Sequence, residues 1–189
     1  NATVKNQEGD PVSGVLVKFY INGVNVGNGT TNGLGVAYYT YKVVSAGNFD
    51  YVAVFDGSAD YNGNSSNLAV ASFGKLGTVL NVTNVSGKKG GNVNLSASLK
   101  DENGNLLVGK VVKFYVNGVY YGSGTTDASG VARVSYSLGV VGSFTYYAVF
   151  DGETNYMQVT SSNASVSVGK GDLSVVVVDV SGKFNSSVV

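Results

Sequence analysis

The chain repeats itself with a period of 95 residues. VKFYINGVNVGNGTT at 17–31 returns as VKFYVNGVYYGSGTT at 112–126, and AVFDG at 53–57 returns at 148–152. In the best-matching ungapped stretch, 15 of 27 aligned positions are identical. This period is the length of one small domain, since domains of about 100 residues are among the commonest. The sequence therefore predicts that one structural module occurs more than once in the chain.

The ends of the repeat divide the chain into three parts. GKLG at 74–77 and GKGD at 169–172 occupy corresponding places and are predicted to be short linkers. Residues 76–170 then form a complete module, whereas residues 1–75 form a module that lacks its first strand and part of its second. Residues 171–189 match the start of the complete module and are predicted to begin the next one. Because linkers of about four residues have little reach, we expect successive modules to form a semi-rigid line.

Apolar residues in the complete module recur with the period of two that is typical of β-strands. Asn117-Gly118, which separates two apolar runs, predicts a hairpin with a type I′ turn. Seven strands are predicted, at 78–84, 92–99, 110–116, 119–124, 131–137, 143–150 and 164–168. Short strands with turn signals between them favour an antiparallel β-sandwich.

Two turns and one strand resemble those of bacterial immunoglobulin-like (Big) repeats. TTNGLGVA at 30–37 and TTDASGVA at 125–132 look like the Thr-(Asp/Asn)-x-x-Gly-x-Ala turn of that family. FTYYAVFDGETNY at 144–156 is similar to its penultimate strand and following loop. The resemblance implies an all-β fold of tandem immunoglobulin-like antiparallel β-sandwiches, with about seven strands per module. The richness in Asn, Gly, Val and Tyr also resembles the adhesin-like surface proteins of methanogenic archaea, whose repeats are implied to form extracellular stalks.

Tyr51 and Tyr146 lie two residues before Ala53 and Ala148, at equivalent places in the repeat. This spacing resembles the tyrosine corner of immunoglobulin domains, with Ala in place of the second Cys. We expect each ring to fill the core and each hydroxyl to bond a nearby backbone group, because buried tyrosines usually find a partner for the hydroxyl. The alternative is a role in stacking against a ligand.

Residue types that carry common enzyme chemistry are missing. The chain has no His and no Cys, so Ser-His, Cys-His and zinc-binding arrangements cannot form. Lys plus Arg equal Asp plus Glu and form no basic stripe, which argues against a nucleic-acid partner. The longest apolar run, LSVVVVDV at 173–180, is too short to cross a bilayer. We therefore predict no enzyme, no cofactor, no nucleic-acid partner and no membrane insertion in this segment.

Polar residues at the ends of strands leave two further possibilities. DGSAD at 56–60 and DGETN at 151–155 could supply oxygen ligands for Ca²⁺, although turn formation is the alternative reading. Lys18 and Lys113 could form a Lys–Asn isopeptide cross-link of the kind found in some surface domains. Strand alternation places both lysines on the face opposite the core aromatics, which argues against the cross-link.

Asn-x-Ser/Thr sequons are about twice as frequent as expected by chance. With 20 Asn and 33 Ser plus Thr among 189 residues, about three to four sequons would be expected. The excess predicts glycosylation of a secreted protein, and the alternative is that Asn, Ser and Thr simply occupy turns and exposed strand positions. The eight candidates are Asn1, Asn28, Asn64, Asn81, Asn84, Asn94, Asn163 and Asn185.

Two apolar surfaces predict contacts between copies of the chain. Strands 49–55 and 144–150 are apolar on both faces, so their outer residues are expected to contact a neighbouring module or fibre. These residues are Val52, Val54, Tyr147 and Val149. Residues 171–189 are predicted to complete residues 1–75 of the next copy, in one continuous polypeptide or by strand donation between subunits. The inter-copy strand residues are Leu173, Val175, Val176, Val177, Val178 and Val180.

These features predict a structural protein outside the cell, on the cell surface. Its modules would form a stalk or a head-to-tail fibre whose partners are other copies of itself, with lateral fibre contacts as a further possibility. The alternative is an adhesin, a binding module that recognises a glycan or a host protein through its loops.

Overall fold

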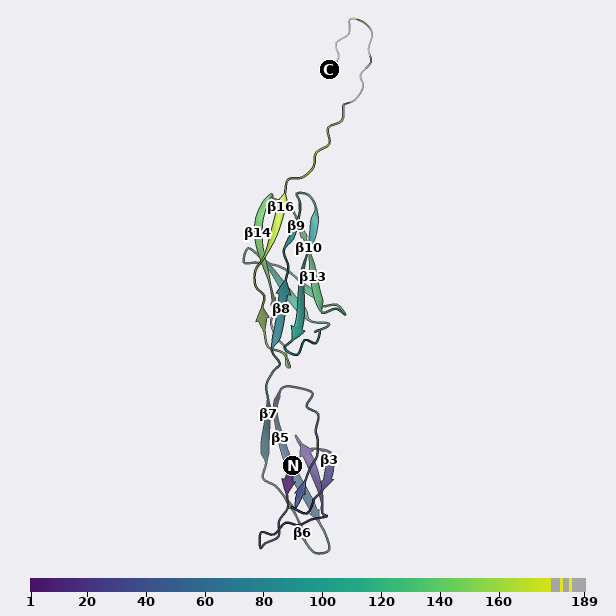
Figure 1. Cartoon of the computed structure of the whole chain (residues 1–189), viewed down its shortest axis with the longest axis vertical. Coiled ribbons are helices and arrows are strands. Elements are labelled where there is room, and N and C mark those ends of the chain that lie inside the picture. Colours follow the sequence, from purple (N-terminus) through teal and green to yellow (C-terminus); the bar gives the residue numbers. More distant parts are fainter. Residues whose placement is uncertain (178–180, 182–183, 185–189) are drawn as a thin grey trace. The chain divides into compact units, whose positions relative to one another are not determined.

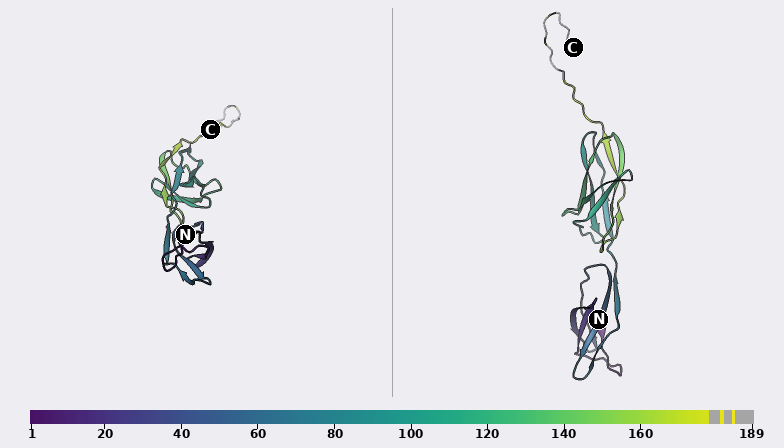
Figure 2. Two further views of the ribbon diagram at one scale, coloured as in Figure 1. Left: turned by 60° about the horizontal axis from the view of Figure 1, so that its bottom comes forward. Right: turned by 180° about the vertical axis from the view of Figure 1, so that it is seen from behind.

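The structure, a computed structural model, describes residues 1–177, 181 and 184. The chain divides into two compact units, each of which is described separately. The first unit comprises Asn1–Gly77 with Gly152–Met157, and the second comprises Thr78–Asp151 with Gln158–Val189. Figure 1 labels some of their strands, and Figure 2 shows the two units from two further directions.

One layer of the second unit is a three-stranded antiparallel sheet. Strand β10 (Asn92–Asp101) lies in the middle, between β8 (Thr78–Val82) and β13 (Val131–Ser137). The predicted alternation along β10 is confirmed, since Leu95 and Leu99 are fully buried while Asn94 is exposed. Burial of one face in this way requires a second layer over the sheet.

The second layer is a larger sheet, and two of its strands, β9 and the short β15, were not predicted. Its members in order are β12 (Val119–Thr125), β11 (Val111–Val116), β14 (Gly142–Phe150), β16 (Ala164–Gly169) and β9 (Val85–Lys88), with the short β15 (Val159–Thr160) also beside β14. β9 pairs with β16 in parallel, whereas the other pairs are antiparallel. The chain therefore crosses from one sheet to the other between β8 and β9, which interrupts the alternation that sequence reading relies on. The all-β immunoglobulin-like sandwich is confirmed with this addition.

The Asn-Gly hairpin turn is confirmed by its backbone angles. Asn117 has φ of 47° and Gly118 has φ of 79°, and the equivalent pair Asn22 and Gly23 has 48° and 77°. A type I′ turn needs positive φ at both central residues, which Asn tolerates and Gly adopts without strain. Both hairpins therefore have the connection that the right-handed twist of paired strands requires.

Tyr146 fills the centre of the second unit as predicted. Its side chain is fully buried, and its hydroxyl donates a hydrogen bond to the carbonyl oxygen of Thr83 at 2.6 Å. Burial raises the pKa of Tyr146 above its usual value, because the charged phenolate would lose its hydration. The ring packs in the core, while the hydroxyl fixes the segment that links β8 to β9.

The first unit has one sheet of similar extent and a second sheet that is much smaller. The larger sheet contains β3 (Val24–Thr30), β2 (Leu16–Ile21), β5 (Gly47–Gly57) and β6 (Asn62–Ser65) in that order, with β7 (Ala69–Phe73) also beside β5. The smaller sheet pairs only β1 (Ala2–Thr3) with β4 (Val36–Ala37). Its counterparts in the second unit, β10 and β13, have ten and seven residues. The small core consists of Val17, Phe19, Ala37 and Ala53.

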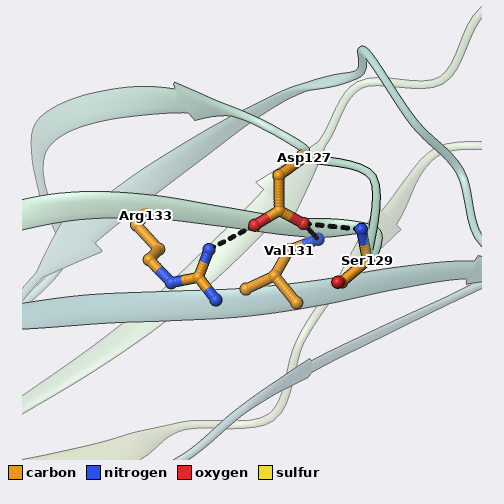
Figure 3. A network of polar contacts seen from close by, with 4 residues as sticks. All are labelled: Asp127, Ser129, Val131 and Arg133. Carbon is orange, nitrogen blue, oxygen red and sulfur yellow. Dashed lines mark hydrogen bonds and ion pairs between the residues drawn. The ribbon is translucent and has the colours of Figure 1, made fainter.

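Asp127 holds the turn before β13 (Figure 3). One carboxylate oxygen accepts hydrogen bonds from the backbone N–H groups of Ser129 at 2.8 Å and Val131 at 3.1 Å, and the other oxygen pairs with Arg133. The hydrogen bond from Arg133 lowers the pKa of Asp127, and the two backbone bonds lower it further. The carboxylate therefore serves the fold in its charged form.

Asp101 holds the turn after β10 in a similar way. Its carboxylate accepts bonds from the backbone N–H groups of Asn103 and Asn105 at 2.9 Å, and from the Asn105 side-chain amide at 2.8 Å. The side-chain bond from Asn105 lowers the pKa of Asp101, against the opposing effect of desolvation. Asn6 and Asn32 occupy the equivalent positions in the first unit. Their side-chain amide oxygens accept hydrogen bonds from backbone N–H groups.

We expect the free energy of unfolding of the second unit to fall in acid. The contribution of Asp101 and Asp127 is complete above their ordinary pKa of 3.8 and is lost as the pH falls through their lower folded-state values. Replacing both by Asn should flatten this pH dependence, because Asn does not titrate. Denaturant unfolding followed by amide signals of β10, from about pH 6 to pH 2, measures the effect. Equal slopes for wild type and the double variant would contradict it.

The hydroxyl of Tyr146 should stabilise the second unit measurably. Tyr146→Phe leaves the Thr83 carbonyl without its buried donor, and we expect a loss of about 1–2 kcal/mol in the free energy of unfolding. Tyr51→Phe is the matched control, because Tyr51 is 36% exposed and its hydroxyl has no partner among the described residues. The control should change stability by less than about 0.5 kcal/mol in dilute monomer. A similar loss in both variants would contradict the prediction, because the hydroxyl of Tyr51 has no such bond to lose.

Candidate functional site

The first unit contains an open groove of about 630 Å³ along β1. One wall is the strand edge formed by residues 2–6, and the opposite wall includes Phe55 and residues 60–66. Val17 and Ala53 also line the groove. Its lining thus combines an extended backbone edge with an apolar interior.

The second unit shows what occupies this position when the sandwich is complete. There the edge 97–101 pairs with all five residues of β8, from Ala97 with Val82 to Asp101 with Thr78. Residues 2–6 precede 97–101 by one repeat period of 95 residues. The groove therefore lies where the first unit would carry its counterpart of β8.

The backbone edge of the groove is suited to pairing with a strand. Val4 donates its N–H to Gly35 at 2.8 Å, and its carbonyl accepts from Val12 at 3.0 Å, so its peptide groups face away from the groove. Because peptide groups alternate in direction along a strand, those of Thr3 and Lys5 face the groove. An open edge of this kind is a template for another strand.

Side chains that are covered in the second unit are exposed around the first-unit core. Tyr51 is 36% exposed, whereas its equivalent Tyr146 is fully buried. Phe73 is 41% exposed, whereas its equivalent Val168 is 4% exposed. Residues 38–44 also form no strand, although their counterparts belong largely to β13. The missing edge strand therefore affects the packing of the whole unit.

The predicted inter-copy strand is exposed along its described part. Leu173 is 96% exposed, Val175 is 90% exposed and Val177 is 88% exposed, and Val176 is exposed as well. The predicted strand residues Val178 and Val180 lie outside the described residues.

The predicted outer-face residues are half-buried within their own sheets. Val52, Val54, Tyr147 and Val149 have this intermediate exposure. Tyr147 stacks on Tyr115 with ring centroids 5.0 Å apart, and Tyr120 meets Tyr115 edge-on at 5.7 Å. Contact with a neighbouring module or fibre stays a prediction.

The candidate calcium loops and cross-linking lysines form ion pairs with each other. Lys18 pairs with Asp56, and Lys113 pairs with Asp151 at the equivalent place. The hydrogen bond to the aspartate raises the pKa of both lysines. Each lysine side chain is more than one-third exposed, whereas an isopeptide cross-link needs a buried lysine. In the part of the chain that the structure describes, no three His, Cys, Asp or Glu side chains gather to hold a metal.

Other repeated polar residues hold the backbone, and the sequence reading did not single them out. Thr31 and Thr126 accept hydrogen bonds from backbone N–H groups at 3.0 and 2.8 Å. Ser66 and Ser161 accept from Ala53 and Ala148 and donate to the next residue's carbonyl. In each pair the two residues are identical and 95 positions apart, and this repetition is the sequence signal by which they could have been found.

Seven predicted glycosylation sites are exposed, namely Asn1, Asn28, Asn64, Asn81, Asn84, Asn94 and Asn163. The eighth, Asn185, lies outside the described residues. Asn84 also accepts a hydrogen bond from the backbone N–H of Ser165 at 2.8 Å. A glycan there would compete with a contact between strands, whereas the side chains of Asn81 and Asn94 form no such contact with the described residues. The described residues contain no helix with the length and apolar character to span a membrane.

The two layers, the strand order and the buried tyrosine define an immunoglobulin-like sandwich. Residues 80–169 match the family model described as bacterial Ig-like domain (group 3), so the predicted resemblance to bacterial immunoglobulin-like repeats is confirmed. A search of curated proteins found no match.

Several solved structures are similar to the chain at low sequence identity. They include the Yersinia pseudotuberculosis adhesin InvE, with 15% identity, 87% of this chain and 52% of that chain covered, and a TM-score of 0.36. The D0-D1 domain of intimin has 18% identity, coverage of 87% and 86%, and a TM-score of 0.35. The Escherichia coli adhesin FdeC has 20% identity, coverage of 91% and 58%, and a TM-score of 0.41. The chain spans about half the length of the first of these structures.

We expect glycans on natively produced protein at Asn81 and Asn94, whose exposed side chains leave room for a sugar. Glycopeptide mass spectrometry measures the occupancy. Asn84 is the internal comparison and should be less occupied, because its side chain already bonds Ser165. Native protein with all its sequons bare would contradict the prediction.

Proposed function

We propose that the chain is a structural part of an extracellular cell-surface protein, in which immunoglobulin-like modules form a stalk or fibre. The observation that supports this proposal is that the polar residues shared by the two units form hydrogen bonds and ion pairs within their own unit. Asn22 and Asn117 accept hydrogen bonds from the backbone opposite the hairpin, at 2.9 and 3.0 Å. The shared Thr, Ser and Lys–Asp residues likewise bond within their own unit. The repeated polar residues therefore maintain the fold of each unit.

The groove and the tail support a head-to-tail fibre. Among the described residues, the first unit has no counterpart of β8 or β9, and residues 173–177 stand one repeat period after β8. The described part of the tail is apolar and exposed, and pairing it with a strand edge would bury part of its apolar side chains. Modules joined in this way would extend from the cell surface as a line.

An adhesive role is the second candidate, and one observation favours it. Tyr115, Tyr120 and Tyr147 form a ring cluster on the outer face of the sheet in the second unit. Their equivalents in the first unit are Tyr20, Asn25 and Val52, so the cluster is particular to the second unit. Exposed aromatic rings with hydroxyl groups can stack on a sugar ring or contact a protein. A glycan array probed with wild type and Tyr120→Asn tests this role.

Surface labelling of intact source cells tests the structural proposal. Antibodies against the second unit should label intact cells along linear projections, and brief protease treatment of those cells should release peptides of this chain. A cytoplasmic protein probed before and after lysis is the control for leakage. Labelling that requires lysis would contradict the extracellular assignment, and labelling without linear projections would contradict the stalk or fibre.

A further inference from the structure

We infer that Asn163 carries an N-linked glycan whose first sugar ring packs against Tyr147 and extends the row of tyrosine rings on the outer face of the second unit. This inference rests on the proposed function, because glycosylation of a sequon implies a secreted protein. It goes further by naming a ligand for the tyrosine rings, namely a sugar attached to the chain itself. Its basis is the position of a sequon beside the free face of the last ring in the row.

Three tyrosine rings form a row across neighbouring strands. Tyr115 on β11 lies opposite Tyr120 on β12 and opposite Tyr147 on β14. The rings of Tyr115 and Tyr147 are stacked, with centroids 5.0 Å apart and an angle of 3° between their planes. Tyr115 therefore covers one face of the Tyr147 ring. The other face is directed away from β11, toward the side of β14 on which β15 and β16 pair.

A bulge occupies that side of β14. Tyr146 lies opposite Ala164 of β16, and Val149 lies opposite Thr160 of β15. Between these two pairs, two residues of β14 lie opposite the three residues 161–163. One strand thus has an extra residue at this point, which defines a β-bulge. Bulges change the direction of side chains at the edge of regular pairing, so the bulge is a place where a side chain can be presented to a neighbour.

The hydrogen bonds of Ser161 show which residues lie beside Tyr147. The Ser161 N–H donates to the Ala148 carbonyl at 2.9 Å, and the Ser161 hydroxyl oxygen accepts from the Ala148 N–H at 2.9 Å. Ser161 therefore lies opposite Ala148. Ser162 and Asn163 together lie opposite Tyr147.

Asn163 faces the same side of the sheet as Tyr147. Tyr146 and Ala148 flank Tyr147 and are buried, and Ala164 follows Asn163 and is buried, whereas Asn163 is exposed. Because side chains alternate between the two faces of a sheet, Tyr147 and Asn163 both point outward. Within the described part of the chain, the Asn163 side chain has no hydrogen-bond partner. Its amide is therefore accessible for modification.

The sequon and the row of rings occur together in the second unit. At the equivalent positions, the first unit has Val52 in place of Tyr147 and Leu68 in place of Asn163. A glycan acceptor and the ring beside it are thus both replaced by aliphatic side chains. This joint difference is expected if the two residues form one site.

Attachment of the glycan is a glycosyl transfer. The Nδ2 atom of Asn163 forms a bond with C1 of the sugar, while the bond from C1 to a phosphate oxygen of a lipid-linked glycosyl phosphate breaks. The amide loses one proton to a base of the transferase, and the leaving phosphate keeps the electron pair. Ser165 supplies the hydroxyl that completes the sequon.

The attached sugar then lies beside the free face of Tyr147. One face of a pyranose ring presents C–H groups, which pack on the negative face of an aromatic ring. Opposite residues in a sheet have Cβ atoms about 4.5–5.5 Å apart, so a sugar on Asn163 is within reach of the Tyr147 ring. The sugar hydroxyls stay in water, so packing covers apolar carbon without burying polar groups. The tyrosine row thus supports a glycan of the chain's own.

The first test locates the glycan on protein purified from its source. Glycopeptide mass spectrometry should find Asn163 occupied. Hydroxyl-radical labelling then measures the accessibility of each tyrosine ring, and labelling of Tyr147 should be lower in the glycoprotein than in Asn163→Gln from the same source. Tyr136 is the internal control, because it is half-buried like Tyr147 but lies on the other sheet. Its labelling should be equal in the two proteins.

The second test measures the interaction between glycan and ring with a double-mutant cycle. Asn163→Gln should raise the unfolding equilibrium constant of the second unit at least about threefold more in the wild-type background than in the Tyr147→Val background. Ser165→Ala removes the same glycan while Asn163 stays, and it should give the same difference. Asn94→Gln is the matched control, because its sequon lies on β10 in the other sheet. Its effect should be the same in both backgrounds.

Three results would overturn the inference. These are an unoccupied Asn163 in native protein, equal labelling of Tyr147 with and without the glycan, and an equal effect of Asn163→Gln in the two backgrounds. Each of them would leave the tyrosine rings free for an external ligand, which the glycan array detects. None of them bears on whether the protein is displayed at the cell surface, so surface labelling tests the proposed function independently.

Discussion

Pairing of β8 with β10 is the interaction on which the second unit depends. β8 satisfies the backbone edge of β10 along five residue pairs, and Leu80 on the same strand closes the core beside Leu99. The segment that follows β8 carries the Thr83 carbonyl that Tyr146 bonds. One short strand therefore supplies backbone pairing, apolar cover and a partner for the largest buried polar side chain.

The first unit shows the consequence when this strand is not among the described residues. Val17 and Phe19 are buried in it much as Val112 and Phe114 are in the second unit. The layer beside the open edge contracts, however, to two residues in each of β1 and β4. Local sequence is similar in the two units, so the difference reflects the loss of pairing partners and not strand propensity. This agrees with the context dependence of β-structure, in which packing and cross-strand neighbours decide whether a strand forms.

Much of the fold could be predicted because its causes are local. The alternation along β10 and the Asn117-Gly118 turn each depend on a few adjacent residues. β9 was not predicted, because its place is fixed by β16, about 80 residues away, and its sequence VSGK has only one apolar side chain. The sequence indicated that residues 1–75 lack strands, but it did not predict the groove. The shape of the groove depends on side chains from segments that are far apart in the sequence. The roles of Thr126 and Ser161 were missed because a hydroxyl residue in a turn or loop does not by itself indicate which backbone group it bonds, and only the repeat at a spacing of 95 residues marks these positions.

The parallel pair of β9 and β16 has a mechanical consequence for the second unit. β9 lies near the start of the unit and β16 ends it, so tension applied to the two ends of this unit pulls the two strands along their length in opposite directions. Bonds that cross between strands are then loaded in shear and must yield together, instead of opening one at a time from an end. Resistance to force is set by the rate of unfolding and not by equilibrium stability. The second unit is thus built to carry load, although no disulfide reinforces it.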